Sequence, residues 1–153
     1  MPQVSVQGIT FIKKWEKFVP TPYVDLAGVW TIGYGTTRIN GKPVTKDTPP
    51  ITEAQATAYL TEHLVSVMQP LVPTIQTFHL NQNQVDALAS FVYNLGFGAF
   101  INSTLHRSIA LKQPITESMF TAWNKARDPH TGKLVEVAGL TRRRREEFQL
   151  FSS

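Results

Sequence analysis

The segment from residue 82 to residue 95 constrains the fold more than any other part of the chain. Asn81 precedes it as an N-cap and Gly96 follows it as a stop, so both ends of a helix are marked. Its apolar residues cover most of the helix circumference, and such a helix is stable only when other elements surround it. We therefore expect it to form the buried axis of a helical region. The apolar set is Val85, Leu88, Ala89, Phe91, Val92 and Leu95.

Other helical patterns lie on either side of this axis. A first helix is expected over residues 5–18, ended by Pro20 and Pro22, and a long helix from the N-cap Thr52 to about Gln69. Further helices are expected at 103–112, 116–127 and 141–150, with Thr141 as the N-cap of the last and a turn at 129–132.

Residues 22–46 differ from the rest of the chain, because they are rich in Gly, Thr, Tyr and Val and contain two turn signals. They predict a small antiparallel sheet of two or three strands. The predicted fold class is therefore α+β, in a single domain over residues 1–153. A β-containing lobe (about 14–50) would connect through a linking helix (about 52–69) to a helical lobe. That lobe (about 75–153) would include the N-terminal helix and leave a cleft suited to a polymer.

The stretch TIGYG at residues 31–35 is close to the T-V-G-Y-G loop of potassium-channel filters. A channel needs spanning helices of about 20 apolar residues, and the chain has no such run. As a strand, the stretch would place Ile32 and Tyr34 inward and Thr31, Gly33 and Gly35 on the other face. Two glycines on one face indicate close approach of a ligand to the backbone, or else a bulge or a tight helix contact.

The register of the preceding hairpin decides what lies beside Thr31. If Leu26-Ala27-Gly28 is a three-residue loop with Gly28 in the left-handed conformation, Asp25 faces Val29. Thr31 then lies diagonally from Asp25 on the same face. A two-residue loop would place the two side chains on opposite faces.

Composition excludes several classes of protein. The chain has 153 residues and no cysteine, which excludes a disulfide scaffold, a Cys-His peptidase and a thiolate zinc site. Its four histidines are scattered, so neither a metal nor another cofactor is expected. The net charge of +4 comes from basic ends around a middle that has no Lys or Arg, which indicates an anionic partner such as nucleic acid, membrane or wall polymer. No helix carries base-reading residues, and the N-terminus has no signal peptide, so we expect accumulation in the cytoplasm.

Glu16 lies near the end of the first predicted helix, where the helix dipole favours a protonated carboxyl group and Lys13 and Lys17 favour an ionised one. A protonated Glu facing an ionised Asp is the pair that glycosidases use. Eight residues separate Glu16 from Asp25, and five separate Asp25 from Thr31. This spacing resembles the E-x8-D-x5-T pattern of the phage lysozyme family, glycoside hydrolase family 24. The segment WEKFVPTPYVDLAGVWTIGYGTT and the C-terminal GLTRRRREEFQLF also resemble that family.

The resemblance implies a lysozyme-like fold and an endolysin that hydrolyses the β-1,4 bond between N-acetylmuramic acid and N-acetylglucosamine. It implies that Glu16 donates the proton while Asp25 and Thr31 hold the attacking water, with inversion. Less specific similarities to the same family make four further residues candidate contacts to the glycan: Gly35, Thr37, Tyr93 and Ser103.

Two alternatives stay open: a lytic transglycosylase, which cuts the same bond without water, and a cationic wall-binding module. Arg142 is the candidate partner of Glu16, and the other arginines of 142–145 would meet an anionic envelope. Since neither a signal peptide nor a membrane anchor is recognised, we expect an enzyme that waits in the host cytoplasm and reaches the wall in the periplasm through a holin-type pore. We also expect a monomer.

Overall fold

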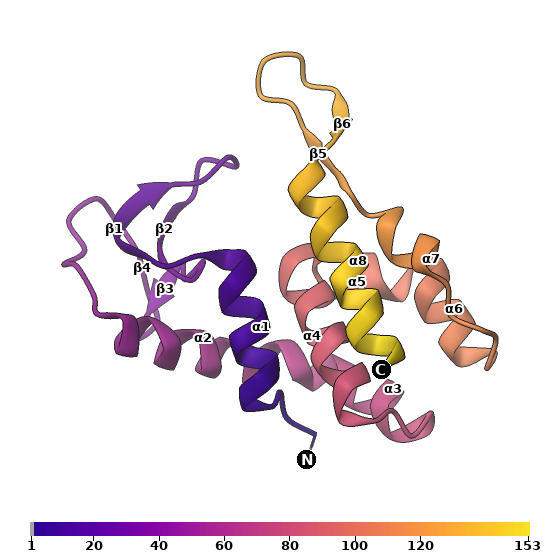
Figure 1. Ribbon diagram of the computed structural model, residues 1–153. Helices are drawn as coiled ribbons and strands as arrows, with labels where there is room; N and C mark the ends of the chain where they lie inside the picture. Colours follow the sequence, from indigo (N-terminus) through magenta and orange to yellow (C-terminus); the bar gives the residue numbers. More distant parts are fainter. Residues whose placement is uncertain (1) are drawn as a thin grey trace.

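In the computed structural model, which describes residues 2–153, helices dominate and short strands lie mainly near the N-terminus. Figure 1 shows β1–β4 on one side of the molecule, α3–α8 on the other, and α2 extending from one to the other. The predicted α+β class is confirmed. The elements are α1 (Val6–Glu16), β1 (Val19–Val24), β2 (Trp30–Gly33), β3 (Arg38–Ile39), β4 (Lys42–Pro43), α2 (Glu53–Met68), η1 (Gln69–Leu71), α3 (Val72–Thr77), α4 (Gln82–Leu95), α5 (Phe97–Ile101), α6 (Thr104–Ala110), α7 (Glu117–Thr121), β5 (Lys125–Arg127), β6 (Leu134–Glu136) and α8 (Ala138–Ser152).

Helix α4 is the buried axis that its sequence predicts. Asn81 caps its first turn in a capping box with Gln84, and Gly96 ends it at a φ of 89°. Every residue from Val85 to Val92 is buried. The ring of Phe91 packs edge-on against Phe100, Phe120 and Trp123 at centroid distances of 5.8–6.2 Å. Because α1, α2 and α8 also pack on α4, this helix fixes the positions of the elements that carry the site.

Helix α1 is anchored to α4 at its N-terminal end and ends at Glu16. The Ser5 hydroxyl accepts a hydrogen bond from the Gly8 amide, and the Ser5 amide donates to buried Asp86 of α4 over 2.9 Å. Lys17 then leaves the helical conformation with a φ of 59°. The helix therefore ends two residues earlier than the expected 5–18.

The hairpin of β1 and β2 has a three-residue loop, the alternative that places Asp25 and Thr31 on one face. Tyr23 pairs with Thr31 and Val24 with Trp30, and the Asp25 amide donates to the Val29 carbonyl. Gly28 has a φ of 81°, as the loop requires. Asp25 and Thr31 therefore belong to the same face of the hairpin. Strands β3 and β4 form a second sheet, so residues 22–46 do not make one continuous sheet.

The expectation of a bare strand face is wrong at Gly33. Ile32 and Tyr34 are buried as predicted, but Thr31 is only 3% exposed. A Cβ on Gly33 would lie 3.1 Å from both Ala56 Cβ of α2 and Ile51 Cδ1. The first glycine therefore permits tight packing of helix on strand, and the strand ends there.

The C-terminal third differs most from expectation. The predicted helix 116–127 ends at Thr121, because the chain then forms the hairpin of β5 and β6, which projects from the molecule (Figure 1). The turn predicted at 129–132 connects these two strands. Helix α5 was not expected, and α8 begins at Ala138, so Thr141 is not its N-cap. No helix within residues 2–153 is long and apolar enough to cross a bilayer.

Candidate active site

Glu16 is the last residue of α1 and turns toward the β-hairpin side of the molecule. Its side chain is 18% exposed, so it is mostly shielded yet reachable from solvent. Oε1 accepts a hydrogen bond from Arg143 over 2.7 Å. A Cβ placed on Gly35 would lie 3.7 Å from Oε2. One oxygen is thus tethered to α8, and the other faces a stretch of backbone without a side chain.

The arginine that holds Glu16 is Arg143, so the expectation of Arg142 is wrong. The expected helix had Thr141 as its N-cap, whereas α8 begins at Ala138, three residues before Thr141, which changes the environment of each arginine. Arg142 is exposed, while Arg143 is 4% exposed and lies against α4. Burial also shows that the four arginines do not form one solvated cationic surface.

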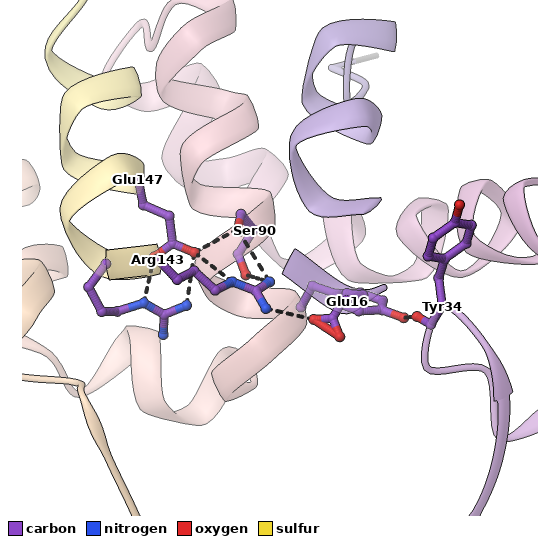
Figure 2. A network of polar contacts seen from close by, with 7 residues as sticks. Glu16, Tyr34, Ser90, Arg143 and Glu147 are labelled. Carbon is purple, nitrogen blue, oxygen red and sulfur yellow. Dashed lines mark hydrogen bonds and ion pairs between the residues drawn. The ribbon is translucent and has the colours of Figure 1, made fainter. Parts of the chain in front are cut away.

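Arg143 belongs to a buried network that joins α8 to α4. Figure 2 shows its guanidinium group between Glu147 and Glu16. Nη2 donates to the Ser90 carbonyl over 3.1 Å, and Nε donates to Glu147 Oε2 over 3.3 Å. The Ser90 hydroxyl donates to the same carboxylate oxygen over 2.6 Å. Three acceptors on three elements therefore fix the plane of the guanidinium group that holds Glu16.

Arg144 is the second cation on Glu147, and both side chains are fully buried. Its Nη2 donates to Oε2 over 2.9 Å, and its Nε lies 2.7 Å from Oε1 without the alignment of a hydrogen bond. The guanidinium group also stacks over the ring of Phe91 at 5.2 Å. Burial raises the pKa of Glu147, and its two guanidinium partners oppose that rise. With Glu16, the network contains two cations and two carboxylates.

Asp25 and Thr31 lie across the hairpin from each other, with Tyr23 on the same face. Asp25 Oδ1 accepts hydrogen bonds from the amides of Ala27 and Val29, over 2.9 and 2.8 Å. The Thr31 hydroxyl donates to the Val29 carbonyl over 2.9 Å. Burial raises the pKa of Tyr23, and the negative charges of Glu16 and Asp25 raise it further. Asp25, Thr31 and Tyr23 therefore share one face of the hairpin.

Tyr93 of α4 completes the wall behind Gly35. Its hydroxyl donates to the Tyr34 carbonyl and would lie 3.0 Å from a Cβ on Gly35. Its ring meets His63 edge-on at 5.6 Å. Burial and the charge of Glu16 raise the pKa of Tyr93, so its phenol stays neutral. Tyr93 thus supports the turn at Gly35, whose φ of +93° also favours glycine.

The remaining candidate contacts fall in two places. Gly35 and Thr37 border a cavity of about 240 Å³ between this turn and α2. Ser103 borders a different cavity of about 420 Å³ beside Trp123. The Ser103 hydroxyl is already used as the cap of α6, because it accepts from the His106 amide and donates to the Phe100 carbonyl.

Sequence reasoning missed Arg143, Ser90 and Tyr23 as residues of this site. The i,i+4 spacing of Arg143 and Glu147 was a usable signal, and the structure shows this pair. Nothing local marked Ser90, whose role depends on how α8 packs on α4. Within residues 2–153, no group of three His, Asp or Glu side chains is placed to hold a metal ion.

Comparison with known proteins agrees with this geometry. The phage lysozyme family matches residues 13–147. An endolysin of Acyrthosiphon pisum secondary endosymbiont phage 1 is 37% identical over 152 residues, covering 98% of each chain. The structure of an endolysin from Escherichia coli O157:H7 phage FAHEc1 superposes with a TM-score of 0.83 at 35% identity, covering 97% of this chain and 92% of that one. The muramidase domain of SpmX from Asticaccaulis excentricus superposes with a TM-score of 0.80 at 30% identity, covering 100% of this chain and 99% of that one.

The family match and the relative of equal length cover the segment from Glu16 to Thr31, the buried axis and the arginine-rich helix together. The chain therefore belongs to the phage lysozyme family, whose members are endolysins and glycoside hydrolases.

Proposed function

We propose that the chain is a muramidase that hydrolyses the β-1,4 bond between N-acetylmuramic acid and N-acetylglucosamine in peptidoglycan, with inversion. The observation that carries the proposal is a tethered Glu16 whose Oε2 faces Gly35, two residues beyond the end of β2, the strand that carries Thr31 on the same hairpin face as Asp25. A similar structure, the muramidase domain of SpmX, is named for the same activity.

Glu16 would be the general acid. Arg143 holds Oε1, so Oε2 is the oxygen that faces the space beside Gly35 and can carry the proton. Protonation of the glycosidic oxygen by this group lets the leaving sugar depart as an alcohol. A glycan strand could lie against the Gly35 backbone, with Thr37 at the edge of the same cavity.

Asp25 and Thr31 would hold the attacking water between them. Thr31 gives its proton to the Val29 carbonyl, so its lone pairs are available to accept from water. Asp25 Oδ1 is bound by two amides, while no hydrogen bond to Oδ2 occurs within residues 2–153. A water that donates to both acceptors points a lone pair away from them. Attack on the anomeric carbon from that side, opposite the leaving oxygen, inverts the configuration.

Tyr93 and Ser103 would act less directly. Tyr93 would hold the turn at Gly35 in place, and Ser103 would shape the cavity that also contains Trp123. Within this proposal β1–β4 form one lobe and the helices on the other side the second, with α2 between them. The enzyme would stay in the host cytoplasm as a monomer until a holin-type pore gives it access to the wall.

Product analysis tests the proposal. On isolated peptidoglycan, wild type should release fragments with reducing N-acetylmuramic acid ends, detected by mass spectrometry. Glu16→Gln should release no fragments. Anhydro-muramic ends would identify a lytic transglycosylase. Lysis by Glu16→Gln at the wild-type rate would indicate a wall-binding cationic protein without catalysis.

A further inference from the structure

The charges behind Glu16 are balanced in a way that the reaction itself does not require. Arg143 alone would neutralise Glu16, yet Glu147 lies on the far side of Arg143 and brings Arg144 with it. Glu147 and Arg144 are 0% exposed, and neither contacts the space where a glycan could bind. Burying two more charges is costly and adds little stability, so their presence points to a different role.

We propose that Glu147 is a positioning residue that aims Arg143 at Glu16 and offsets part of the positive charge that Arg143 brings to Glu16. This inference rests on the proposed function of Glu16 as the general acid. Without Glu147, the full charge of Arg143 would act on Glu16 and favour its ionised form, which cannot donate a proton.

Geometry supports the aiming role. Glu147 Oε2 accepts from Arg143 Nε, from Arg144 Nη2 and from the Ser90 hydroxyl. Arg143 Nη1 is left to point out of the network, and it is the atom that reaches Glu16 (Figure 2). A guanidinium group is planar, so fixing Nε and Nη2 fixes the direction of Nη1.

The electrostatic role follows from burial. Charges in a low-dielectric interior act on one another more strongly than charges on the surface. The fall in the pKa of Arg144 that burial causes is partly opposed by the charge of Glu16, so the two ends of the network are coupled. Arg144 must therefore act on Glu16 with the sign opposite to that of Glu147.

Other titratable groups around the network are neutral, bind other partners or are exposed. Tyr23 and Tyr93 have raised pKa values and stay neutral, and Asp86 on α4 binds Ser5 and Gln82. Three cations on α1 and α8 have partners outside the network: Lys13 pairs with Glu53, Lys14 with Glu146 and Arg145 with Glu117. The other charged side chains around it are those of Asp25, Lys17 and Arg142.

The test compares Glu147→Gln and Arg144→Gln by the pH dependence of kcat/KM on isolated peptidoglycan. The alkaline limb of the profile reports the loss of the proton from the general acid. Glu147→Gln should move this limb to lower pH by about one unit, and Arg144→Gln should move it to higher pH by a similar amount. Destabilisation alone cannot produce opposite shifts, because it lowers the rate without moving the limb in two directions.

Matched controls lie next in sequence on the same helix. Glu146→Gln and Arg145→Gln remove the same charges from exposed pairs with Lys14 and Glu117, so their limbs should stay at the wild-type pH. Rates are taken per folded molecule, judged by circular dichroism. If only one of the two buried variants folds, the direction of its shift decides.

The inference would be overturned if the alkaline limbs of Glu147→Gln and Arg144→Gln stayed at the wild-type pH or moved in the same direction. It would also be overturned if the limbs of the surface controls moved by the same amount. The wild-type products separate this failure from that of the proposed function. Reducing ends from wild type with unmoved limbs would refute only the role of Glu147, whereas no hydrolysis by wild type would refute the proposed function.

Discussion

Replacing Arg143 by Met removes the tether of Glu16 while keeping most of the side-chain volume. Arg143 is 4% exposed and binds Glu16, Glu147 and the Ser90 carbonyl at 2.7, 3.3 and 3.1 Å. Breaking a buried ion pair costs about 3–5 kcal/mol, and Glu147 keeps Arg144, so we expect a loss of about 3 kcal/mol. For a domain of this size that lowers Tm by roughly 6–12 °C.

The effect on rate should exceed what the lost stability explains. Without Arg143, Glu16 can rotate away from the glycosidic oxygen, and a misplacement of about 1 Å can cost about 100-fold. We expect kcat to fall roughly 10- to 100-fold at a temperature well below the new Tm. The assay is hydrolysis of isolated peptidoglycan, with Tm measured by circular dichroism on the same preparation.

Arg142→Met is the matched control, because Arg142 is exposed and does not contact Glu16. Its free energy of unfolding should change by less than about 0.5 kcal/mol and its rate should stay at the wild-type value. A wild-type kcat in Arg143→Met, or an equal loss in Arg142→Met, would refute the tether.

Three further predictions follow from the geometry around Gly35 and α2. Gly35→Ala should abolish activity, because a Cβ there would meet Tyr93 and Glu16. The control Gly132→Ala, at a φ of +70° in open space, should cost about 1 kcal/mol of stability and keep the wild-type rate. A fully active Gly35→Ala would contradict the close approach. Tyr93→Phe should lose about 1 kcal/mol of stability and leave the shape of the pH–rate profile unchanged, since the raised pKa of Tyr93 keeps its phenol neutral; a shifted limb would show that Tyr93 titrates. Lys13 and Tyr34 hold the pKa of Glu53 below its ordinary value of 4.5. The Tm difference between wild type and Glu53→Gln should therefore be present above pH 4.5 and vanish as the pH falls. A Tm difference that persists in acid would contradict the ion pair.

Local signals in the sequence predicted much of the fold. Thr52 and Asn81 were predicted correctly as the N-caps of α2 and α4. A capping interaction spans only three residues, so the local sequence is enough to indicate it. The sequence reduced the hairpin register to two alternatives, which differ in the length of the loop after Asp25. The structure has the three-residue loop with Gly28 in the left-handed conformation, so Asp25 and Thr31 share one face.

Most of the errors depend on packing between distant segments. Nothing near Gly33 indicates that Ala56 lies against it. Residues 125–127 were expected to be helical, because β5 and β6 have three residues each, too few for the alternating pattern of a strand to be recognised. The choice of Arg143 over Arg142 depends on where α8 begins and how it packs on α4, which the run of four arginines does not reveal.

The account centres on a water held by Asp25 and Thr31 opposite the acid Glu16. Proton NMR of the anomer first released from a soluble peptidoglycan fragment tests this most directly. Direct attack by that water predicts that the α-anomer of the new reducing end appears first and then equilibrates. Initial release of the β-anomer, or of a product without a reducing end, would contradict the arrangement proposed for Asp25 and Thr31.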